Sequence, residues 1–164
     1  MKKQFDVKTP IKRSPFADFF EDVEATDIFL LCKEDADQIC STYIDSSTNS
    51  YWFLKDDHPL LVGKRECIGD WSTPYNNDDN SQLSLLLEDK LEWNGDDVIY
   101  YIINRDTVLE TSWRSFLKFW DAFIAAKDEC PFIVSSTDKE NTLLINPNGE
   151  VFLYRSAHLA DNLA

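Results

Sequence analysis

Residues 111–127 constrain the fold more than any other part of the sequence. Their apolar side chains recur at the i, i+3, i+4, i+7 spacing of a helix with one buried face. These side chains are Trp113, Phe116, Leu117, Trp120, Phe123 and Ile124. The two Trp and two Phe rings can bury roughly 600–1,000 Å², at about 150–250 Å² per ring. A helix of this kind requires a broad apolar surface to pack against.

Short apolar runs on both sides of the predicted helix supply that surface. They occupy residues 98–103, 131–134, 142–145 and 151–154. The first run is rich in β-branched and aromatic residues and is apolar on both faces, which is typical of a central strand. Gly149 can supply the positive φ of a short hairpin loop between the last two runs. The predicted fold is therefore α+β, an antiparallel sheet with helices packed on it in a single pair of layers.

The remaining chain divides into a short N-terminal segment and one domain. Residues 1–13 carry five basic residues and one acid, and we expect a flexible basic lead-in. Residues 14–164 are long enough for one α+β domain with a core of its own. Apolar spacing predicts helices over residues 14–24, 34–44 and 82–91, and strands over residues 28–32, 51–54 and 60–62. Residues 104–110 are expected to link the central strand to the long helix.

The chain is strongly acidic, with a net charge of −14 from 30 acidic and 16 basic residues. This charge disfavours nucleic acid and anionic lipid as partners and favours a basic protein. Two stretches, residues 16–37 and 70–97, each hold eight carboxylates against a single Lys. Such runs are also typical of solvated faces, so an acidity that serves only solubility remains an alternative.

The second acidic stretch contains the least regular part of the chain, residues 69–81. Long irregular loops in compact domains are often functional, and buried aromatic residues often dominate the energy of an interface. We therefore predict a partner-binding site in this stretch, with residues 16–37 as the second choice and an ordinary surface loop as the alternative. The predicted site consists of Asp70, Trp71, Tyr75, Asp78, Asp79, Glu88, Asp89, Asp96 and Asp97.

The sequence contains no recognisable catalytic or metal-binding constellation. His58 follows two Asp residues, but adjacent residues on a strand point to opposite faces, which favours a turn over a metal site. His158 has no visible partner, and there are four glycines and no GxSxG motif. Arg105 and Glu110 flank the start of the long helix, where a structural ion pair is favoured over a role in a site. We expect no catalytic residue, no metal and no cofactor.

The pattern of cysteines and apolar runs predicts a cytoplasmic protein. The four cysteines show no CxxC spacing, and we expect reduced, buried thiols. No apolar run approaches the roughly 20 residues that a membrane span needs. The first residues lack the apolar core of a secretory signal.

Residues 98–155 carry a W-x-x-F-L-x-x-W-x-x-F-I helix, an Asp-Glu pair after it and a closing hairpin with Asn-Gly. This pattern resembles small uncharacterised bacterial proteins and is similar to immunity proteins of contact-dependent and secreted toxin systems. The resemblance implies a protein without enzymatic activity that binds and neutralises a basic toxin, such as a nuclease. It carries over no catalytic residue.

Two alternatives to an immunity protein stay open. One is a domain of unknown function with an unrecognised enzymatic site, which lacks a visible constellation. The other is an acidic mimic of nucleic acid, which requires regularly spaced rows of carboxylates, whereas immunity requires one cluster with aromatic anchors. The oligomeric state is not predicted.

Overall fold

A computed structural model describes residues 8–126 and 130–155 of the chain. Its centre is an eight-stranded sheet in which every neighbouring pair of strands is antiparallel, in the order β1-β2-β5-β4-β6-β7-β8-β3. The strands are β1 (Lys8–Pro10), β2 (Phe29–Leu31), β3 (Lys64–Asp70), β4 (Val98–Asn104), β5 (Thr107–Ser112), β6 (Phe132–Ser135), β7 (Asp138–Ile145) and β8 (Glu150–Arg155).

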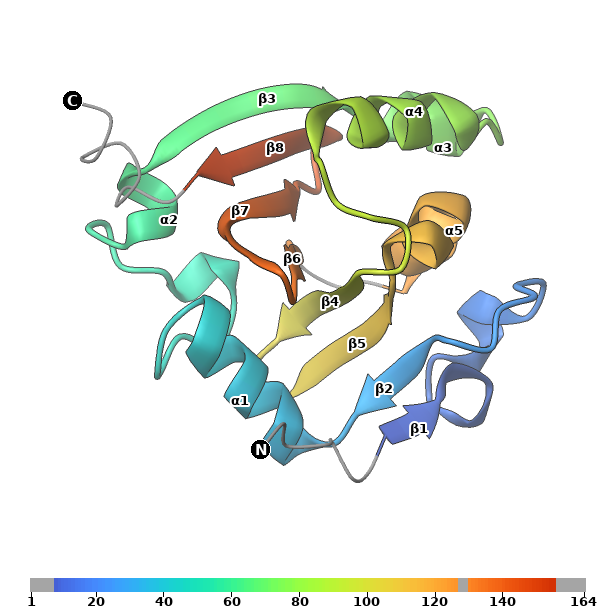
Figure 1. Cartoon of the computed structure of the whole chain (residues 1–164), viewed down its shortest axis with the longest axis horizontal. Coiled ribbons are helices and arrows are strands. Elements are labelled where there is room, and N and C mark those ends of the chain that lie inside the picture. Colours follow the sequence, from blue (N-terminus) through green and yellow to red (C-terminus); the bar gives the residue numbers. More distant parts are fainter. Residues whose placement is uncertain (1–7, 127–129, 156–164) are drawn as a thin grey trace.

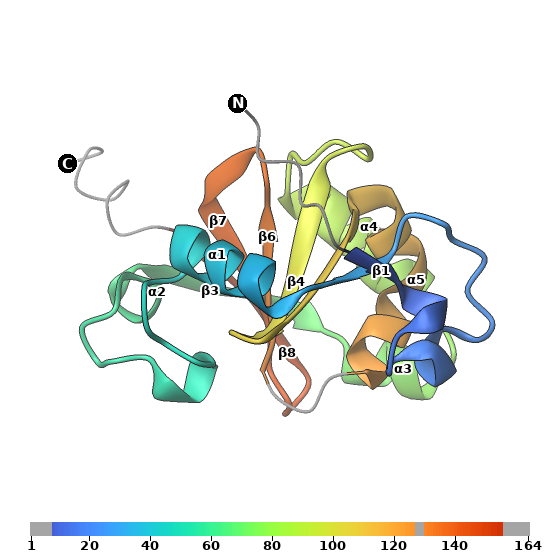
Figure 2. The same cartoon turned by 90° about the horizontal axis from the view of Figure 1, so that it is seen from below.

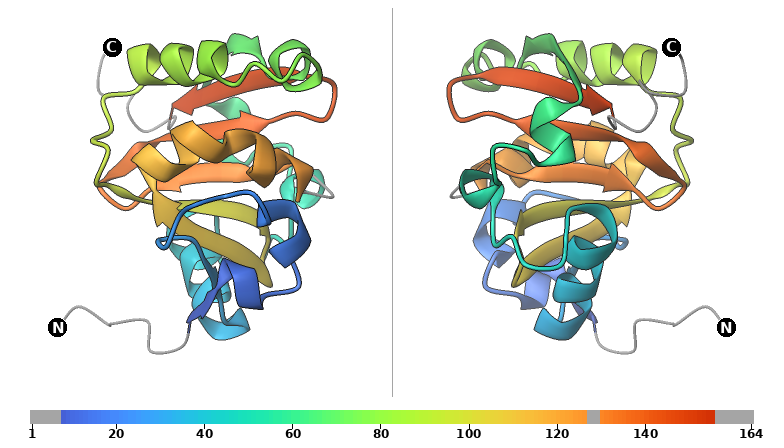
Figure 3. Two further views of the ribbon diagram at one scale, coloured as in Figure 1. Left: turned by 90° about the vertical axis from the view of Figure 1, so that its right-hand side faces the viewer. Right: turned by 90° about the vertical axis from the view of Figure 1, so that its left-hand side faces the viewer.

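Helical segments cover both faces of this sheet. They are η1 (Ile11–Arg13), η2 (Ala17–Phe20), α1 (Lys33–Tyr43), η3 (Tyr51–Phe53), α2 (Pro59–Val62), α3 (Ser72–Asn76), α4 (Ser81–Lys90) and α5 (Trp113–Ala125). The sheet curves around α5, with α1 and α2 on the opposite face (Figure 1). Figure 2 shows the sheet as the middle of three layers, and Figure 3 shows α5 lying roughly along the strands with α4 beside it. None of the helices in the described ranges is long and apolar enough to span a membrane.

Apolar side chains point alternately to the two faces of the sheet, and they form two hydrophobic cores. In β4, Ile99, Tyr101 and Ile103 face the core under α5, whereas Tyr100 and Ile102 face the core under α1. The predicted central strand with two apolar faces is therefore confirmed, and so is the α+β class. We expected a single pair of layers, and the second core adds a third layer on the face of the sheet away from α5.

The predicted organising helix is confirmed as α5. Ser112 caps its start, because its hydroxyl accepts a hydrogen bond from the backbone N–H of Ser115 at 3.2 Å. All six predicted apolar positions are buried, and Trp120 is fully enclosed. The end of the predicted helix, at residue 127, lies outside the described residues.

The segment between α1 and β3 differs from the prediction. Residues 51–54 and 60–62 were predicted as strands, but the structure has η3 and α2 there. His58 caps α2, since its Nδ1 accepts the N–H of Leu60 at 3.1 Å, and Pro59 occupies the first helical position. Runs of three or four apolar residues are too short for their period to separate a strand from a helical turn.

The N-terminal segment also differs from the prediction from residue 8 onward. Strand β1 pairs with β2, and Ile11 is only 2% exposed, so residues 8–13 belong to the domain. Lys8 Nζ lies 2.7 Å from Oε1 of Glu110, a carboxylate that is buried and therefore requires a charged partner. Residues 1–7 of the predicted lead-in lie outside the described residues. The helix predicted over residues 14–24 is reduced to η2.

A polar network, rather than an ion pair with Glu110, holds Arg105 in the β4–β5 turn. The Arg105 guanidinium contacts Asp37 Oδ1 at 2.8 Å and Asp45 Oδ1 at 3.4 Å, and its Nε donates to the carbonyl of Thr48 at 2.9 Å. Asp45 Oδ2 lies 3.1 Å from Nε2 of His58. The network therefore ties α1, the loop after it and the start of α2 to one turn of the sheet.

We expect Trp120→Ala to lower the free energy of unfolding by about 3–5 kcal/mol, because it leaves a cavity under α5. Urea denaturation measures this loss. The matched control is Trp52→Ala, since Trp52 is 59% exposed, and its change should stay within about 1 kcal/mol. Equal effects of the two substitutions would contradict the predicted packing of α5.

Asp45 makes the stability of the fold depend on pH. Burial raises the pKa of Asp45, but hydrogen bonds from Thr48 and Ser47 and the neighbouring His58 outweigh burial and lower it to about 2, from 3.8. A carboxyl whose pKa is lower in the folded state stabilises the fold above the unfolded pKa, and this contribution is lost as pH falls toward 2.

Asp45→Asn should therefore cost about 1–2 kcal/mol at pH 5, because solvent screens part of the interaction. It should also flatten the decline in stability between pH 5 and pH 2.5. Urea midpoints at several pH values provide the measurement, and Asp106→Asn, an exposed Asp without an ion pair among the described residues, is the control. An unchanged pH slope in Asp45→Asn would contradict this role.

Candidate functional site

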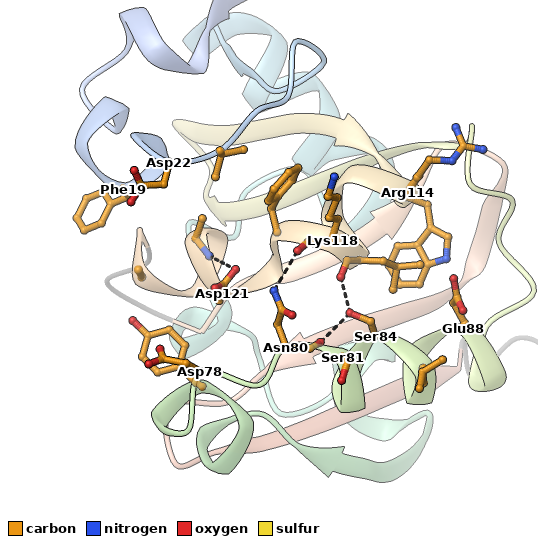
Figure 4. A pocket seen from close by; sticks show the side chains of 18 of the residues that line it. Phe19, Asp22, Asp78, Asn80, Ser81, Ser84, Glu88, Arg114, Lys118 and Asp121 are labelled. Carbon is orange, nitrogen blue, oxygen red and sulfur yellow. Dashed lines mark hydrogen bonds between the residues drawn. The ribbon is translucent and has the colours of Figure 1, made fainter.

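A groove of about 1,210 Å³ lies between η2, α4 and α5 (Figure 4). One wall is the η2 segment with the turn after it, the other wall is the end of α3 with α4, and the floor is the outward face of α5. Pockets for small ligands usually have volumes of about 300–1,000 Å³. The groove is therefore large enough for a segment of another protein.

A kink in α5 shapes the floor of the groove. Phe119 has non-helical angles, φ −123° and ψ 23°, inside the helix. The carbonyls of Leu117 and Lys118 accept hydrogen bonds from Ser84 Oγ and, at 3.2 Å, from Asn80 Nδ2. Side chains at the start of α4 thus satisfy the carbonyls beside the kink and fix α4 against α5.

The lining of the groove is predominantly acidic. Six carboxylates line it, against two cations, Arg114 and Lys118. The carboxylates are Asp18, Glu21, Asp22, Asp78, Glu88 and Asp121. None of the six forms an ion pair among the described residues, and Arg114 is paired at 2.6 Å with Asp96, which lies outside the lining. The groove consequently carries a concentrated negative charge, which its two cations offset only in part.

Apolar side chains also reach the groove. Phe19 and Leu85 are 48% and 66% exposed, so both offer apolar surface to a partner. Phe119 lines the floor between them and is partly buried. Trp113 contributes to the lining as well, and its indole N–H has no hydrogen-bond partner within the described part of the chain. The groove therefore combines charge with apolar contact area.

The structure brings together parts of both acidic stretches found in the sequence. Of the predicted partner-binding residues, Tyr75, Asp78 and Glu88 line the groove. The segment ranked second, residues 16–37, supplies three of the remaining carboxylates. The sequence located both clusters but did not show that they meet.

Two predicted site residues, Asp70 and Asp79, accept backbone hydrogen bonds at the starts of helices. Asp70 accepts hydrogen bonds from the backbone N–H of Ser72 and of Thr73, both at 3.1 Å, at the start of α3. The hydrogen bonds from Ser72 and Thr73 lower the pKa of Asp70 to about 2. Asp79 accepts the N–H of Ser81 at 3.2 Å at the start of α4. Both carboxylates have partners that the local fold requires.

The predicted loop 69–81 is more ordered than expected, because it contains α3. Trp71 packs against the core under α5, and its Nε1 donates to the carbonyl of Asn146 at 2.7 Å. The ring also meets Tyr75 edge-on, with 5.8 Å between centroids. Trp71 is therefore half-buried beside the groove rather than an exposed anchor, and its part in binding stays a prediction.

The other predicted acids are not part of the groove lining. Asp96 pairs with Arg114, and Asp97 accepts the N–H of Asn94 at 2.9 Å in a turn. Asp97 and Asp89 line a second, smaller depression of about 550 Å³. These three acids belong to the same sequence cluster as the groove carboxylates but to other surfaces.

Sequence reasoning missed the contribution of α5 to the groove, including Lys118, Phe119 and Asp121, and also missed Leu85. Lys118 and Asp121 follow Arg114 at helical spacing on the outward side of α5, and that stripe was the available signal. The apolar face of the same helix is the stronger pattern, and it identifies the buried side only.

The structure offers no evident centre for metal or thiol chemistry in the residues it describes. These residues contain no group of three or more His, Cys, Asp or Glu that could hold a metal ion. All four cysteines are free, but only Cys40 and Cys130 are buried, while Cys32 is half-buried and Cys67 is exposed. The expectation of buried thiols therefore holds for two of the four. His158 lies outside the described residues.

The fold and groove define an α+β domain with an acidic groove of a size suited to a protein segment. Residues 17–153 match the model of a family described as "Protein of unknown function (DUF2947)", and the chain belongs to this family. No curated protein and no solved structure matches the chain. The family match carries no link to immunity proteins or toxin systems.

We expect Trp71→Phe to lower the free energy of unfolding by about 1 kcal/mol, because it removes the hydrogen bond to the turn between β7 and β8. Chemical denaturation measures the loss. Trp52→Phe, at an exposed position, is the matched control and should have no comparable effect. A Trp71→Phe variant as stable as the native chain would contradict this structural role of the Trp71 indole.

Proposed function

We propose that this protein binds a basic partner protein through the groove between η2, α4 and α5. The observation that supports this most directly is the convergence of six carboxylates without ion pairs on a groove that also presents apolar side chains. The carboxylates come from segments far apart in the sequence, so chain composition alone does not explain their meeting. A cationic partner surface would compensate their charge.

The two kinds of side chain have different tasks in this proposal. Exposed charges accelerate encounter with an oppositely charged partner, and the acceleration decreases with salt. Apolar side chains that become buried slow dissociation. Carboxylates such as Asp22 and Asp78 therefore set the rate of association, and Phe19 and Leu85 set the lifetime of the complex.

The arrangement of the carboxylates favours a protein partner over mimicry of nucleic acid. The groove acids are carried by η2 and its turn, by the α3–α4 segment and by α5, and they surround a depression. A mimic requires rows that follow the spacing of phosphates. One cluster with apolar contacts fits a docking site for protein.

Neutralisation of a basic toxin is the narrower form of this proposal. In that form the groove masks a basic surface that the toxin needs for its activity. The test is co-expression: cells that make the toxin should survive with the native chain and die with a chain whose groove acids are replaced. Equal survival would restrict the proposal to binding without neutralisation.

The binding experiment uses a groove variant and a charge-matched control. The groove variant is Asp22→Asn with Asp78→Asn, and Asn also tolerates the left-handed backbone of Asp78, φ 52°. The control is Asp56→Asn with Asp57→Asn, two exposed acids in the turn before α2 that form no ion pair among the described residues. Immobilised chains are exposed to lysate of cells that naturally make the protein.

A basic protein retained by the native chain and the control, but lost by the groove variant, is the expected result. Its association rate should decrease about 3–10-fold in the groove variant at low salt. Leu85→Ala should mainly accelerate dissociation. Retention of the same proteins by the groove variant and the native chain would place the interface elsewhere and contradict the proposal.

A further inference from the structure

We propose that the groove binds the basic partner segment as an α-helix, and in one direction only. This inference rests on the proposed function. The cationic N-terminal half of that helix lies against Asp22, Asp78 and Asp121. Its C-terminal end lies beside Arg114 and Lys118. Three features of the groove carry this inference: the absence of strands from its described lining, the distribution of charge along it and its length.

The walls of the groove favour a helix because they offer a bound chain no strand edge. None of the described lining residues belongs to a strand, and most belong to helical segments, whose backbone groups are largely paired within the helix. The carbonyls of Leu117 and Lys118, beside the kink, already accept from Ser84 and Asn80. An extended segment docks by adding backbone hydrogen bonds to a free strand edge. A segment buried in this groove must instead satisfy its own backbone, which a helix does.

The charges in the groove are separated along its length. Figure 4 shows Asp22, Asp78 and Asp121 around one end, Arg114 with Glu88 at the other end, and Lys118 between them. Asp18 and Glu21 are carried on the same short segment as Asp22 and add to the acidic end. At the other end Arg114 is already paired with Asp96, and the charge of Glu88 offsets that of Lys118. The groove therefore runs from a strongly negative end to an end with almost no net charge.

This gradient matches the two ends of a helix. The N-terminus of a helix has unpaired N–H groups and a partial positive charge, and the C-terminus has unpaired carbonyls and a partial negative charge. The acidic end of the groove suits the N-terminus of a bound helix. Arg114 and Lys118 on the floor are donors for the carbonyls at the C-terminus of the helix.

The length of the floor limits the bound helix to about three turns. The floor residues run from Arg114 to Ala125, which corresponds to about 16 Å of helix and to roughly 11 residues of a partner helix. Phe19 and Leu85 lie on opposite walls and can contact an apolar stripe of the partner helix at the i, i+3, i+4 spacing. The partner segment is therefore a short helix with an apolar stripe and cations in its first two turns.

Two stapled peptides test the direction of binding. One is a 14-residue Ala-based helix with three Lys in the first two turns, a Leu stripe and Glu in the last turn. The other has the same residues in reverse order. Both are acetylated and amidated to remove the terminal charges, and both carry the same lactam staple, so that helicity is matched. Fluorescence anisotropy measures their affinity for the full chain.

We expect the first peptide to bind about fivefold more tightly than the reversed one at low salt, with the ratio shrinking as salt screens the helix ends. Lys118→Gln should reduce this ratio, whereas Lys139→Gln, at an exposed position outside the groove lining, should leave it unchanged. A nitroxide on the N-terminus of the first peptide should broaden the NMR signals of Asp78 and Asp121 more than those of Arg114 and Glu88.

The outcomes separate this inference from the proposed function. Equal affinities for both peptides, lost together in Asp22→Asn with Asp78→Asn, would overturn the inferred direction and leave the groove as a binding site for basic segments. Broadening centred on Arg114 would likewise overturn it. Binding by the unstapled peptide alone, in an extended conformation, would overturn the helical form of the bound segment. Absence of binding by either peptide would count against the proposed function itself.

Discussion

The packing of the aromatic face of α5 into the curved sheet is the interaction on which the rest of the structure depends. Trp113, Phe116, Trp120 and Phe123 are fully enclosed there. The hydroxyl of Tyr101 on β4 donates to the carbonyl of Phe123 at 3.0 Å, which ties the end of the helix to the central strand. Because this one helix fills the concave face of the sheet, the shorter segments around it are placed by their contacts with α5. Phe20 of η2 meets Phe123 edge-on at 5.1 Å, and α4 is held through Trp120, whose Nε1 donates to the carbonyl of Asn80 at 2.8 Å.

The groove follows from the same packing. A helix that buries one face presents the other, and η2 and α4 approach α5 from its two sides without covering it. The kink at Phe119 displaces carbonyls that Ser84 and Asn80 then satisfy, so the position of α4 and the shape of the floor are fixed together. The candidate site is therefore rigid where it touches the core, and its charged side chains extend from fixed backbone positions.

The sequence predicted the elements whose pattern is long or strongly apolar. The stripe of α5, the two-faced run of β4, the hairpin at Gly149 and the helix α4 were all identified, since each has a clear period or a specific turn residue.

The strands β3 and β5 were missed. Lys64, Arg65 and Glu66 begin β3 at the edge of the sheet, where one long side is unpaired and polar residues are tolerated. Polar residues at both ends of Thr107–Ser112 obscured β5 in the same way. The composition located the acidic stretches of the site, but their convergence depends on tertiary contacts that local patterns do not encode.

The carboxylates of this chain fall into two groups with different physical explanations. Those of the first group accept hydrogen bonds from backbone N–H groups at turns and helix starts, as Asp45, Asp70, Asp79 and Asp138 do. The fold requires these residues, because they satisfy donors that would otherwise lack partners.

The second group comprises groove residues that accept no hydrogen bond and form no ion pair among the described residues. They are Asp18, Glu21, Asp22, Asp78 and Glu88. Like charges held close together repel one another and destabilise the compact state. Local structure therefore gives no reason for these five acids to surround one groove. A cationic partner does give one, since it converts their mutual repulsion into attraction at the moment of binding.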